Sequence, residues 1–151
     1  MICKGGNELE GFFRRFLSLY RPLITSLNEL MSQYELSYSL WQVIYYLKNN
    51  GPSTLVEISI QYHVEKPTIT RRVHRLEELQ MVEQIPGKDR REKMIQLTEF
   101  GEEIYQVCRK RITNLEYLVM ERIPIEEQNS AFQIFPKIQE QLMNREGNKN
   151  D

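Results

Sequence analysis

The stretch formed by residues 64–98, VEKPTITRRVHRLEELQMVEQIPGKDRREKMIQLT, constrains the fold more than any other part of this chain. It opens with a helix pattern over residues 66–79. A strand pattern over residues 82–85, a charged turn over residues 87–92 and a second strand over residues 93–97 follow. A basic helix followed directly by a hairpin with a basic tip suits a protein that holds a polyanion at two places.

The positive charge of the chain is concentrated in this stretch. The whole sequence has 20 Lys and Arg against 21 Asp and Glu, a net charge of −1. Residues 63–75, however, hold four basic residues and one acid, and residues 88–93 hold four basic residues and two acids. Focused charge of this kind favours phosphate binding over the alternative of ordinary solvated helix charges. A helix can reach base edges in the major groove while a hairpin tip reaches the neighbouring backbone or minor groove, so the pattern predicts a winged helix-turn-helix module.

The sequence before this stretch predicts three helices. Apolar residues at helical spacing indicate a long amphipathic helix over residues 8–34, which Pro22 is expected to kink. A second helix, capped by Ser37 or Ser39, runs to Leu47 and ends at the breaker run NNGP. A short helix over residues 55–61 is capped by Ser53 or Thr54, with Glu57 in its first turn. Short helix, basic helix and hairpin together give a mainly α (α+β) fold with a two-stranded β-wing.

Two more helices are expected after the hairpin. Thr98 caps the first, whose apolar stripe extends to Ile123, and a last helix with a bend at Pro136 follows Pro124. A 151-residue monomer cannot easily bury such stripes around a small lobe, whereas two copies can pack their first and last helices across a two-fold axis. We therefore expect one continuous domain in three parts: an N-terminal dimerisation helix (1–35), a DNA-binding lobe (36–98) and C-terminal dimerisation helices (99–151). The alternative is that these helices fold back on their own core.

Three segments carry a resemblance to a known family. They are LSYSLWQVIYYLKNNGPSTLVEIS (residues 36–59), PTITRRVHRLEELQMVE (residues 67–83) and DRREKMIQLTEFG (residues 89–101). The last is the most specific, because Asp-x-Arg at this distance before Leu-Thr-x-x-Gly marks the family's wing. Over nearly its whole length the chain resembles the multiple antibiotic resistance regulator (MarR) family of bacterial transcription factors. The resemblance implies a homodimer that binds a pseudo-palindromic operator, most commonly as a repressor.

The resemblance also implies roles for individual residues. Arg91 is expected at the wing tip, inserted into the minor groove, while Asp89 braces the wing by pairing with Arg75. The full set of expected DNA-binding residues is Ser53, Thr54, Lys66, Pro67, Thr68, Thr70, Arg71, Arg75, Arg90 and Arg91. The chain departs from the family at Gln80, where a glycine is usual. Because a left-handed cap costs a non-glycine residue about 1 kcal/mol, a different turn geometry is expected there. His74 stands where an aspartate is common.

The resemblance further implies a cleft between the dimerisation helices and the lobe, where some members bind small aromatic compounds. The aromatic residues expected near that junction are Tyr20, Tyr34, Tyr38, Trp41 and Tyr45, although aromatic residues at helical spacing more often belong to a core. Thiol-based redox sensing through Cys3 or Cys108 is the alternative of the same fold. The two histidines and two cysteines lack close ligand spacing, so neither a metal nor a cofactor is expected.

Other classes of protein fit less well. No glycine-rich phosphate loop, HExxH or GxSxG motif is present, so we expect no enzyme and no catalytic residues. No apolar run is long enough for a membrane span, and no secretion signal is recognisable at the N-terminus, which together with only two cysteines indicates a cytoplasmic protein with no membrane partner. A winged helix that binds proteins rather than DNA stays open as an alternative, although such modules tend to lack a basic wing tip.

Overall fold

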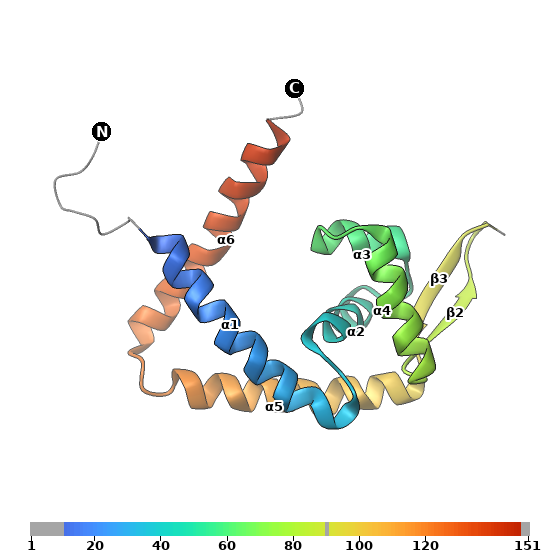
Figure 1. The fold of residues 1–151 in the computed structure, drawn as a ribbon, viewed down its shortest axis with the longest axis horizontal. Helices are drawn as coiled ribbons and strands as arrows, with labels where there is room; N and C mark the ends of the chain where they lie inside the picture. The colour runs from blue at the N-terminus through green and yellow to red at the C-terminus, as the bar shows by residue number, and fades with distance from the viewer. Residues whose placement is uncertain (1–10, 90, 149–151) are drawn as a thin grey trace. The chain divides into compact units, whose positions relative to one another are not determined.

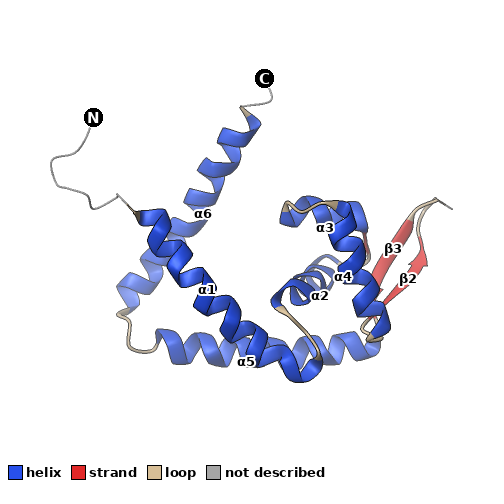
Figure 2. Cartoon of the chain, viewed as in Figure 1, coloured by secondary structure: helices blue, strands red, loops and turns tan. Residues whose placement is uncertain are grey.

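The computed structural model describes residues 11–89 and 91–148, and within them the chain is mainly helical with one small sheet (Figures 1 and 2). In chain order the elements are α1 (Phe12–Met31), the short 3₁₀ helix η1 (Ser32–Tyr34), α2 (Tyr38–Asn50), β1 (Ser53–Thr54), α3 (Leu55–Tyr62), α4 (Lys66–Glu78), β2 (Val82–Pro86), β3 (Lys93–Leu97), α5 (Glu99–Met120) and α6 (Ile125–Gly147). The predicted fold class, a winged helix-turn-helix with long N- and C-terminal helices, is confirmed.

The chain divides into two compact units, with the boundary between Ile112 and Thr113 inside α5. The first unit holds α1 to β3 and the first half of α5, and the second holds the rest of α5 and α6. The division into three functional parts at residues 35 and 98 stays a prediction. None of the helices in the described part of the chain is both long enough and apolar enough to cross a membrane.

Side chains cap two helices of the lobe, α2 and α3, at the places where capping was expected. Ser37, rather than Ser39, accepts a hydrogen bond from the Leu40 N–H at 3.3 Å. Thr54 and Glu57 form a reciprocal capping box, in which Thr54 Oγ1 accepts from the Glu57 N–H and Glu57 Oε2 accepts from the Thr54 N–H. Each contact satisfies a backbone N–H that the helix itself leaves without an acceptor. The first helix runs unbroken across Pro22 and ends at Met31, three residues earlier than expected.

The turn after α4 corrects one expectation. Gln80 has a φ of 61°, so it adopts the left-handed conformation that a glycine would, and the turn geometry does not differ. The Met81 N–H donates to the Leu76 carbonyl at 2.9 Å and the Gln80 N–H to the Glu77 carbonyl at 2.9 Å, the pattern of a Schellman cap. Leu76 and Met81, the two positions whose side chains commonly pack together in such a cap, are both buried.

The sheet has three antiparallel strands in the order β1-β3-β2, so β3 is its central strand. The wing hairpin itself pairs Val82 with Leu97 at its base and Pro86 with Lys93 near its tip. The third strand, β1, pairs Ser53 with Ile95 and was not expected, because two residues are too few to show an alternating pattern. It ties the start of α3 to the wing, which places both elements on one side of the lobe (Figure 1).

The base of the wing is closed against the start of α5. The Thr98 N–H donates to the Met81 carbonyl at 3.0 Å, and Thr98 Oγ1 donates to the Gln80 carbonyl and accepts from the Gly101 N–H. A Cβ at Gly101 would lie 2.0 Å from the Met81 carbonyl oxygen, so the position requires glycine. The core of the first unit lies between these elements; its largest fully buried side chains are Met31, Ile44, Ile58, Ile69, Leu76, Ile95, Val43 and Cys108.

Candidate nucleic-acid interface

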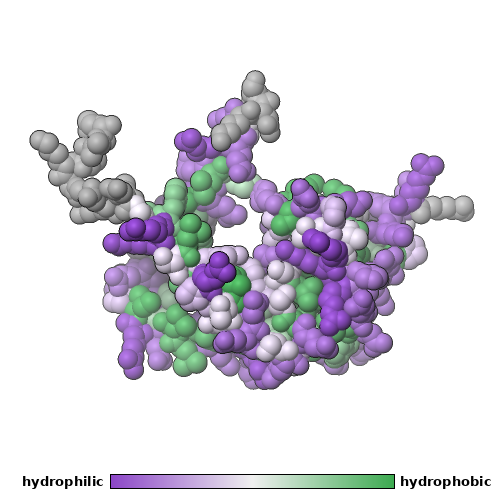
Figure 3. All heavy atoms as spheres, viewed as in Figure 1, coloured by the Kyte–Doolittle hydropathy of each residue, from purple (hydrophilic) through white to green (hydrophobic). Residues whose placement is uncertain are grey.

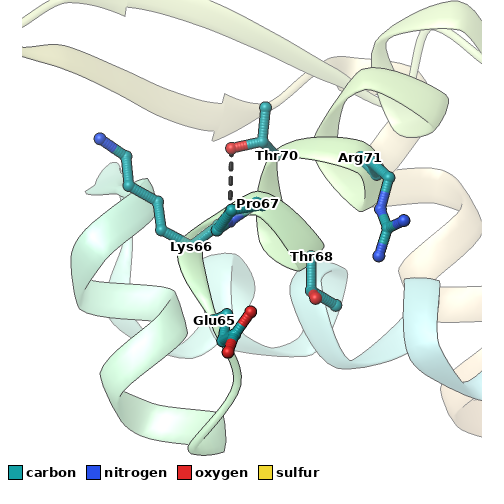
Figure 4. Close-up of a pocket in the computed structure, with 6 residues that line it drawn as sticks. All are labelled: Glu65, Lys66, Pro67, Thr68, Thr70 and Arg71. Carbon is teal, nitrogen blue, oxygen red and sulfur yellow. Dashed lines mark hydrogen bonds between the residues drawn. The ribbon is translucent and has the colours of Figure 1, made fainter.

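The N-terminus of α4 opens onto an exposed hollow of about 740 Å³ (Figure 4). Its lining residues are Glu65, Lys66, Pro67, Thr68, Thr70 and Arg71, which include five of the predicted DNA-binding residues. The side chains of Lys66 and Arg71 extend to opposite sides of the hollow, and Thr70 Oγ1 donates to the Lys66 carbonyl at 3.0 Å (Figure 4). Proline is tolerated in this first turn because the N–H that it lacks would have no helical acceptor.

One face of α4 is buried and the rest carries the charge. Ile69, Val73 and Leu76 pack into the lobe at three- and four-residue spacing, which fixes the helix axis. Arg71 is exposed, and its side chain makes no hydrogen bond or ion pair with any residue that the structure describes. A cation held on a rigid helix without a partner of its own is suited to bind an anion from solution.

A second hollow, of about 380 Å³, brings three segments of the chain together. Thr54 from β1, Lys66 from α4 and Arg91 from the wing all line it, beside Leu55, Val56, Glu92 and Lys93. Three residues that the sequence predicted to bind DNA, from parts of the chain far apart in sequence, therefore lie around one depression. A smaller cavity of about 90 Å³ separates α4 from the wing, with Thr70 and His74 on one side and Gln84 and Lys93 on the other.

The wing tip is organised by its own backbone. The Gly87 N–H donates to the Glu92 carbonyl at 3.1 Å, and the Glu92 N–H donates to the Asp89 carbonyl at 3.0 Å. Asp89 Oδ1 accepts from the Arg91 N–H at 3.3 Å, so this carboxylate holds the chain beside Arg91 in place. The Arg91 side chain itself is exposed. The expectation for Arg90 lies outside the described residues.

Two expected roles are corrected by this geometry. Arg75 does not pair with Asp89: its guanidinium contacts Glu78 Oε2 at 3.0 Å and Glu35 Oε1 at 3.3 Å. The reason is the helical period, because the cavity beside the wing is lined by Thr70, Val73, His74 and Glu77, a stripe from which position 75 is turned away. The second correction concerns Ser53, which is 2% exposed and donates its hydroxyl to the Gly51 carbonyl at 2.8 Å. Its side chain supports the sheet rather than facing a ligand.

The aromatic residues expected to line an effector cleft are partly packed on one another. Trp41 is 6% exposed and stacks on Tyr105, with ring centroids 5.4 Å apart and planes within 5°. Tyr45 lies 6.2 Å from Trp41, and Lys48 Nζ lies over the Tyr105 ring while pairing with Glu102 at 2.7 Å.

The other expected cleft residues lie elsewhere in the first unit. Tyr34 faces the Arg111 guanidinium at 5.4 Å, the Tyr38 N–H donates to Asn28 Oδ1 at 2.7 Å, and Tyr20 is exposed on α1. Tyr105 and Lys48 also belong to the cluster around Trp41, although neither was expected, because α5 and α2 come together only in the folded chain. An effector cleft at these rings stays a prediction.

The buried cysteine has little thiolate character. Cys108 is fully buried on α5, and burial raises the pKa of its thiol to about 11, opposed only by the weaker effect of Arg111. At neutral pH the group is a protonated thiol, which is a poor nucleophile and reacts slowly with oxidants. Cys3 lies outside the described residues, so the expectation of redox sensing through Cys3 stays a prediction. Among the residues that are described, no cluster of three metal-ligating side chains occurs.

Comparisons with known proteins agree with this geometry. The model of the MarR family matches residues 36–93, which run from the start of the lobe to the wing. An uncharacterized HTH-type transcriptional regulator of Bacillus subtilis, YwoH, is 36% identical over 96 residues, which are 64% of this chain and 70% of the relative. The chain belongs to the MarR family. The family consists of transcriptional regulators, so the expectations of a regulator and of no enzyme are both confirmed.

Solved structures of the family share the fold of this MarR-family chain. A Staphylococcus aureus MarR in complex with salicylate and kanamycin is 25% identical, with a TM-score of 0.82 over 89% of this chain and 92% of the other. A mutant MarR from E. coli complexed with operator DNA is 22% identical, with a TM-score of 0.78 over 87% of this chain and 96% of the other. At that identity the second comparison shows the fold alone.

Proposed function

We propose that this MarR-family regulator is a homodimeric repressor that binds a pseudo-palindromic operator through the face formed by the two hollows around α4. The observation that carries the proposal is the convergence of Thr54, Lys66 and Arg91 on one depression, next to the exposed Arg71. The three cations Lys66, Arg71 and Arg91 form no ion pair with the described residues, whereas Arg75 pairs with two carboxylates. Phosphate binding needs cations that are not already paired with carboxylates of the protein.

Each element then has a role on the duplex. The N-terminal half of α4 enters the major groove, where Thr68, Thr70 and Arg71 reach base edges. Thr54 lies at the N-terminus of α3 and contacts the backbone, while Arg91 at the wing tip enters the adjacent minor groove. A mutant MarR from E. coli with the same fold was solved in complex with operator DNA, which supports a DNA-binding role for the fold.

The homodimer is proposed from the apolar surface outside the lobe. Of the described residues in α6 none is buried, and Phe132 is 81% exposed. Figure 3 shows hydrophobic residues at the molecular surface. Exposed apolar patches of this size mark interfaces, and a second copy offers the matching patch about a two-fold axis. Two recognition helices would then meet half-sites with centres about 10 bp apart. Light scattering tests this directly, since a stable species of 18.1 kDa at micromolar concentration would reject the dimer.

Operator binding is tested by titrating the protein against the DNA upstream of its own coding region and against a random duplex, at several salt concentrations. We expect tighter binding to the upstream DNA and a steep fall of both affinities with salt. Arg71→Ala should lower operator binding more than random binding, because a base contact is lost. Equal losses on both duplexes would make Arg71 a phosphate contact. No binding to either duplex at low salt would favour a protein-interaction module.

Regulation by a small aromatic ligand is the second part of the proposal. Its support is the cluster of Trp41, Tyr45 and Tyr105 on the lobe, together with the salicylate that was present with the S. aureus MarR. Salicylate is therefore the first probe, and its binding should change the fluorescence of Trp41 and lower operator affinity. A loss of operator affinity on peroxide treatment, abolished by Cys3→Ser, would instead support thiol-based sensing.

A further inference from the structure

Two neighbouring arginines of α4 lie in different environments. Arg71 is exposed, and its side chain forms no hydrogen bond or ion pair with the described part of the chain. Arg72 is half-buried, and its Nη1 donates to Gln42 Oε1 at 3.2 Å. Gln42 belongs to α2. Both arginines add charge to the basic helix, but only Arg71 was expected to bind DNA, and only Arg71 has no hydrogen-bond partner among the described residues.

Gln42 makes a second contact, to the helix that precedes α4. Its backbone carbonyl accepts a hydrogen bond from Tyr62 Oη at 2.8 Å, and Tyr62 is the last residue of α3. The Tyr62 ring packs edge-on against Tyr46 of α2, with centroids 6.3 Å apart. Burial raises the pKa of Tyr62 to about 12, so its hydroxyl stays protonated and remains a donor throughout the physiological range.

One residue of α2 therefore bonds to both helices of the helix-turn-helix. The apolar contacts of Ile69, Val73 and Leu76 hold α4 against the lobe, but such contacts are not directional and allow small rotations and shifts along the axis. Hydrogen bonds have narrow geometry, and one with a charged donor is about twice as strong as a neutral one. The Gln42 contacts thus fix what the apolar contacts leave free, the rotation of α4 and its angle to α3.

We propose that Gln42 and Arg72 are positioning residues for sequence recognition, and that Arg72 does not contribute its charge to DNA binding. This inference rests on the proposed function, because it assumes that α4 reaches base edges. A helix held slightly out of rotation still meets phosphates but misplaces the side chains that discriminate between bases. Loss of the contact should therefore reduce discrimination while leaving the electrostatic part of binding unchanged.

The experiment measures two quantities for the full-length protein: the ratio of operator to random-duplex affinity, and the slope of log affinity against log salt. Gln42→Leu should lower the ratio about tenfold, a size typical of directly coupled residues, with the slope unchanged. Gln42→Glu keeps an acceptor for Arg72 and should keep the ratio. Arg72→Met removes the donor and the charge together. We expect its affinity ratio to fall as far as that of Gln42→Leu, while its salt slope stays equal to that of the wild type.

The double variant and a matched arginine complete the design. Gln42→Leu with Arg72→Met should be no worse than either single variant, because both remove the same contact. Arg71→Met combined with Gln42→Leu should lose more discrimination than either single variant, because Gln42→Leu also misplaces Thr68 and Thr70.

A fall in slope of about 0.9 for Arg72→Met would identify a phosphate contact and overturn the inference. Additive losses for the Gln42 and Arg72 pair would overturn it too. If a thermal scan shows that Gln42→Leu does not fold, the salt slope of Arg72→Met and the affinity ratio of Gln42→Glu still test the inference. Failure of the wild type to bind any duplex would count against the proposed function alone.

Discussion

The two units of the molecule differ in how far their apolar residues are buried. Every buried hydrophobic residue of the described chain lies between Leu27 and Ile112, within the first unit. The second unit leaves Tyr117, Leu118 and Phe132 more than 65% exposed, and the described residues of α6 include none that is buried. The difference shows that the first unit has a core of its own, whereas the exposed apolar residues of the second unit are the ones that the proposed dimer would cover.

The outer part of α1 resembles the C-terminal unit more than the lobe. Leu27 and Met31, near the end of the helix, are buried, but Phe13, Leu17 and Leu23 are between 44% and 61% exposed. The change along one helix from exposed to buried apolar residues shows where the core of the lobe ends. Perturbations on the two sides of that boundary should have different consequences, for assembly on one side and for folding on the other.

The largest effect is expected when the chain is cut before Pro124. Removal of α6 should abolish the dimer and with it operator binding, since a single lobe loses the avidity of two linked half-sites, a factor of about 10²–10⁴. No residue of the proposed DNA-binding face is removed. Sedimentation and an operator titration measure the two effects. Undiminished operator affinity in the shortened chain would show that α6 has no part in assembly, and Trp41 fluorescence during thermal unfolding monitors the integrity of the lobe.

Substitution of one glycine in each unit tests how each unit contributes to stability rather than to assembly. Gly101→Ala places a Cβ 2.0 Å from the Met81 carbonyl oxygen, at the junction of α5 and the wing. We expect it to lower the free energy of unfolding by about 3 kcal/mol or more, because backbone must move to make room. Gly147→Ala, at the end of α6, meets no atom within 4 Å and should leave stability nearly unchanged. Similar effects from both substitutions in denaturant melts would contradict the difference in packing.

The third effect is on binding alone. Arg91→Ala should weaken operator affinity by about 1–3 kcal/mol, because a wing-tip cation contacts DNA but adds little to the core. Stability should change by less than about 0.5 kcal/mol, as at other exposed positions. Lys110→Ala, also exposed but on α5 and outside both hollows, is the matched control and should leave affinity unchanged. An Arg91→Ala variant with wild-type affinity in an anisotropy titration would remove the wing from the proposed interface.

The sequence was most informative where local chemistry decides the structure. The capping box of Thr54 and Glu57, the strand over residues 93–97 and the start of the helix at Lys66 follow from residues close together in the chain, and all three were predicted. The partner of Arg75 could not be predicted, because Glu35 lies 40 positions away in sequence and only the folded lobe brings it near.

Family resemblance misled at Asp89 and Ser53 for a related reason. A resemblance carries over the role of a residue without its contacts. In this chain Asp89 accepts from the Arg91 N–H instead of pairing with Arg75, and the Ser53 hydroxyl donates to the Gly51 carbonyl. Gln42 is the opposite case, a residue with a structural role that the family resemblance did not indicate. It stands in a helical segment with no charge or motif to single it out, and its link to Tyr62 and Arg72 depends on how three helices meet.

The smallest expected effect concerns the strained turn after α4, and it raises stability. Gln80 has a φ of 61°, a conformation that costs an L-residue other than glycine roughly 1 kcal/mol or more. Gln80→Gly removes that cost while the backbone hydrogen bonds of the cap are kept, so the unfolding free energy should rise by up to about 1 kcal/mol, less the entropy of a more flexible unfolded chain. The matched control is Gln106→Gly, an exposed position inside α5, where the same change should lower stability by about 1 kcal/mol. Urea melts of the two variants should therefore shift in opposite directions, and a loss of stability in both would mean that the cap at Gln80 depends on its side chain.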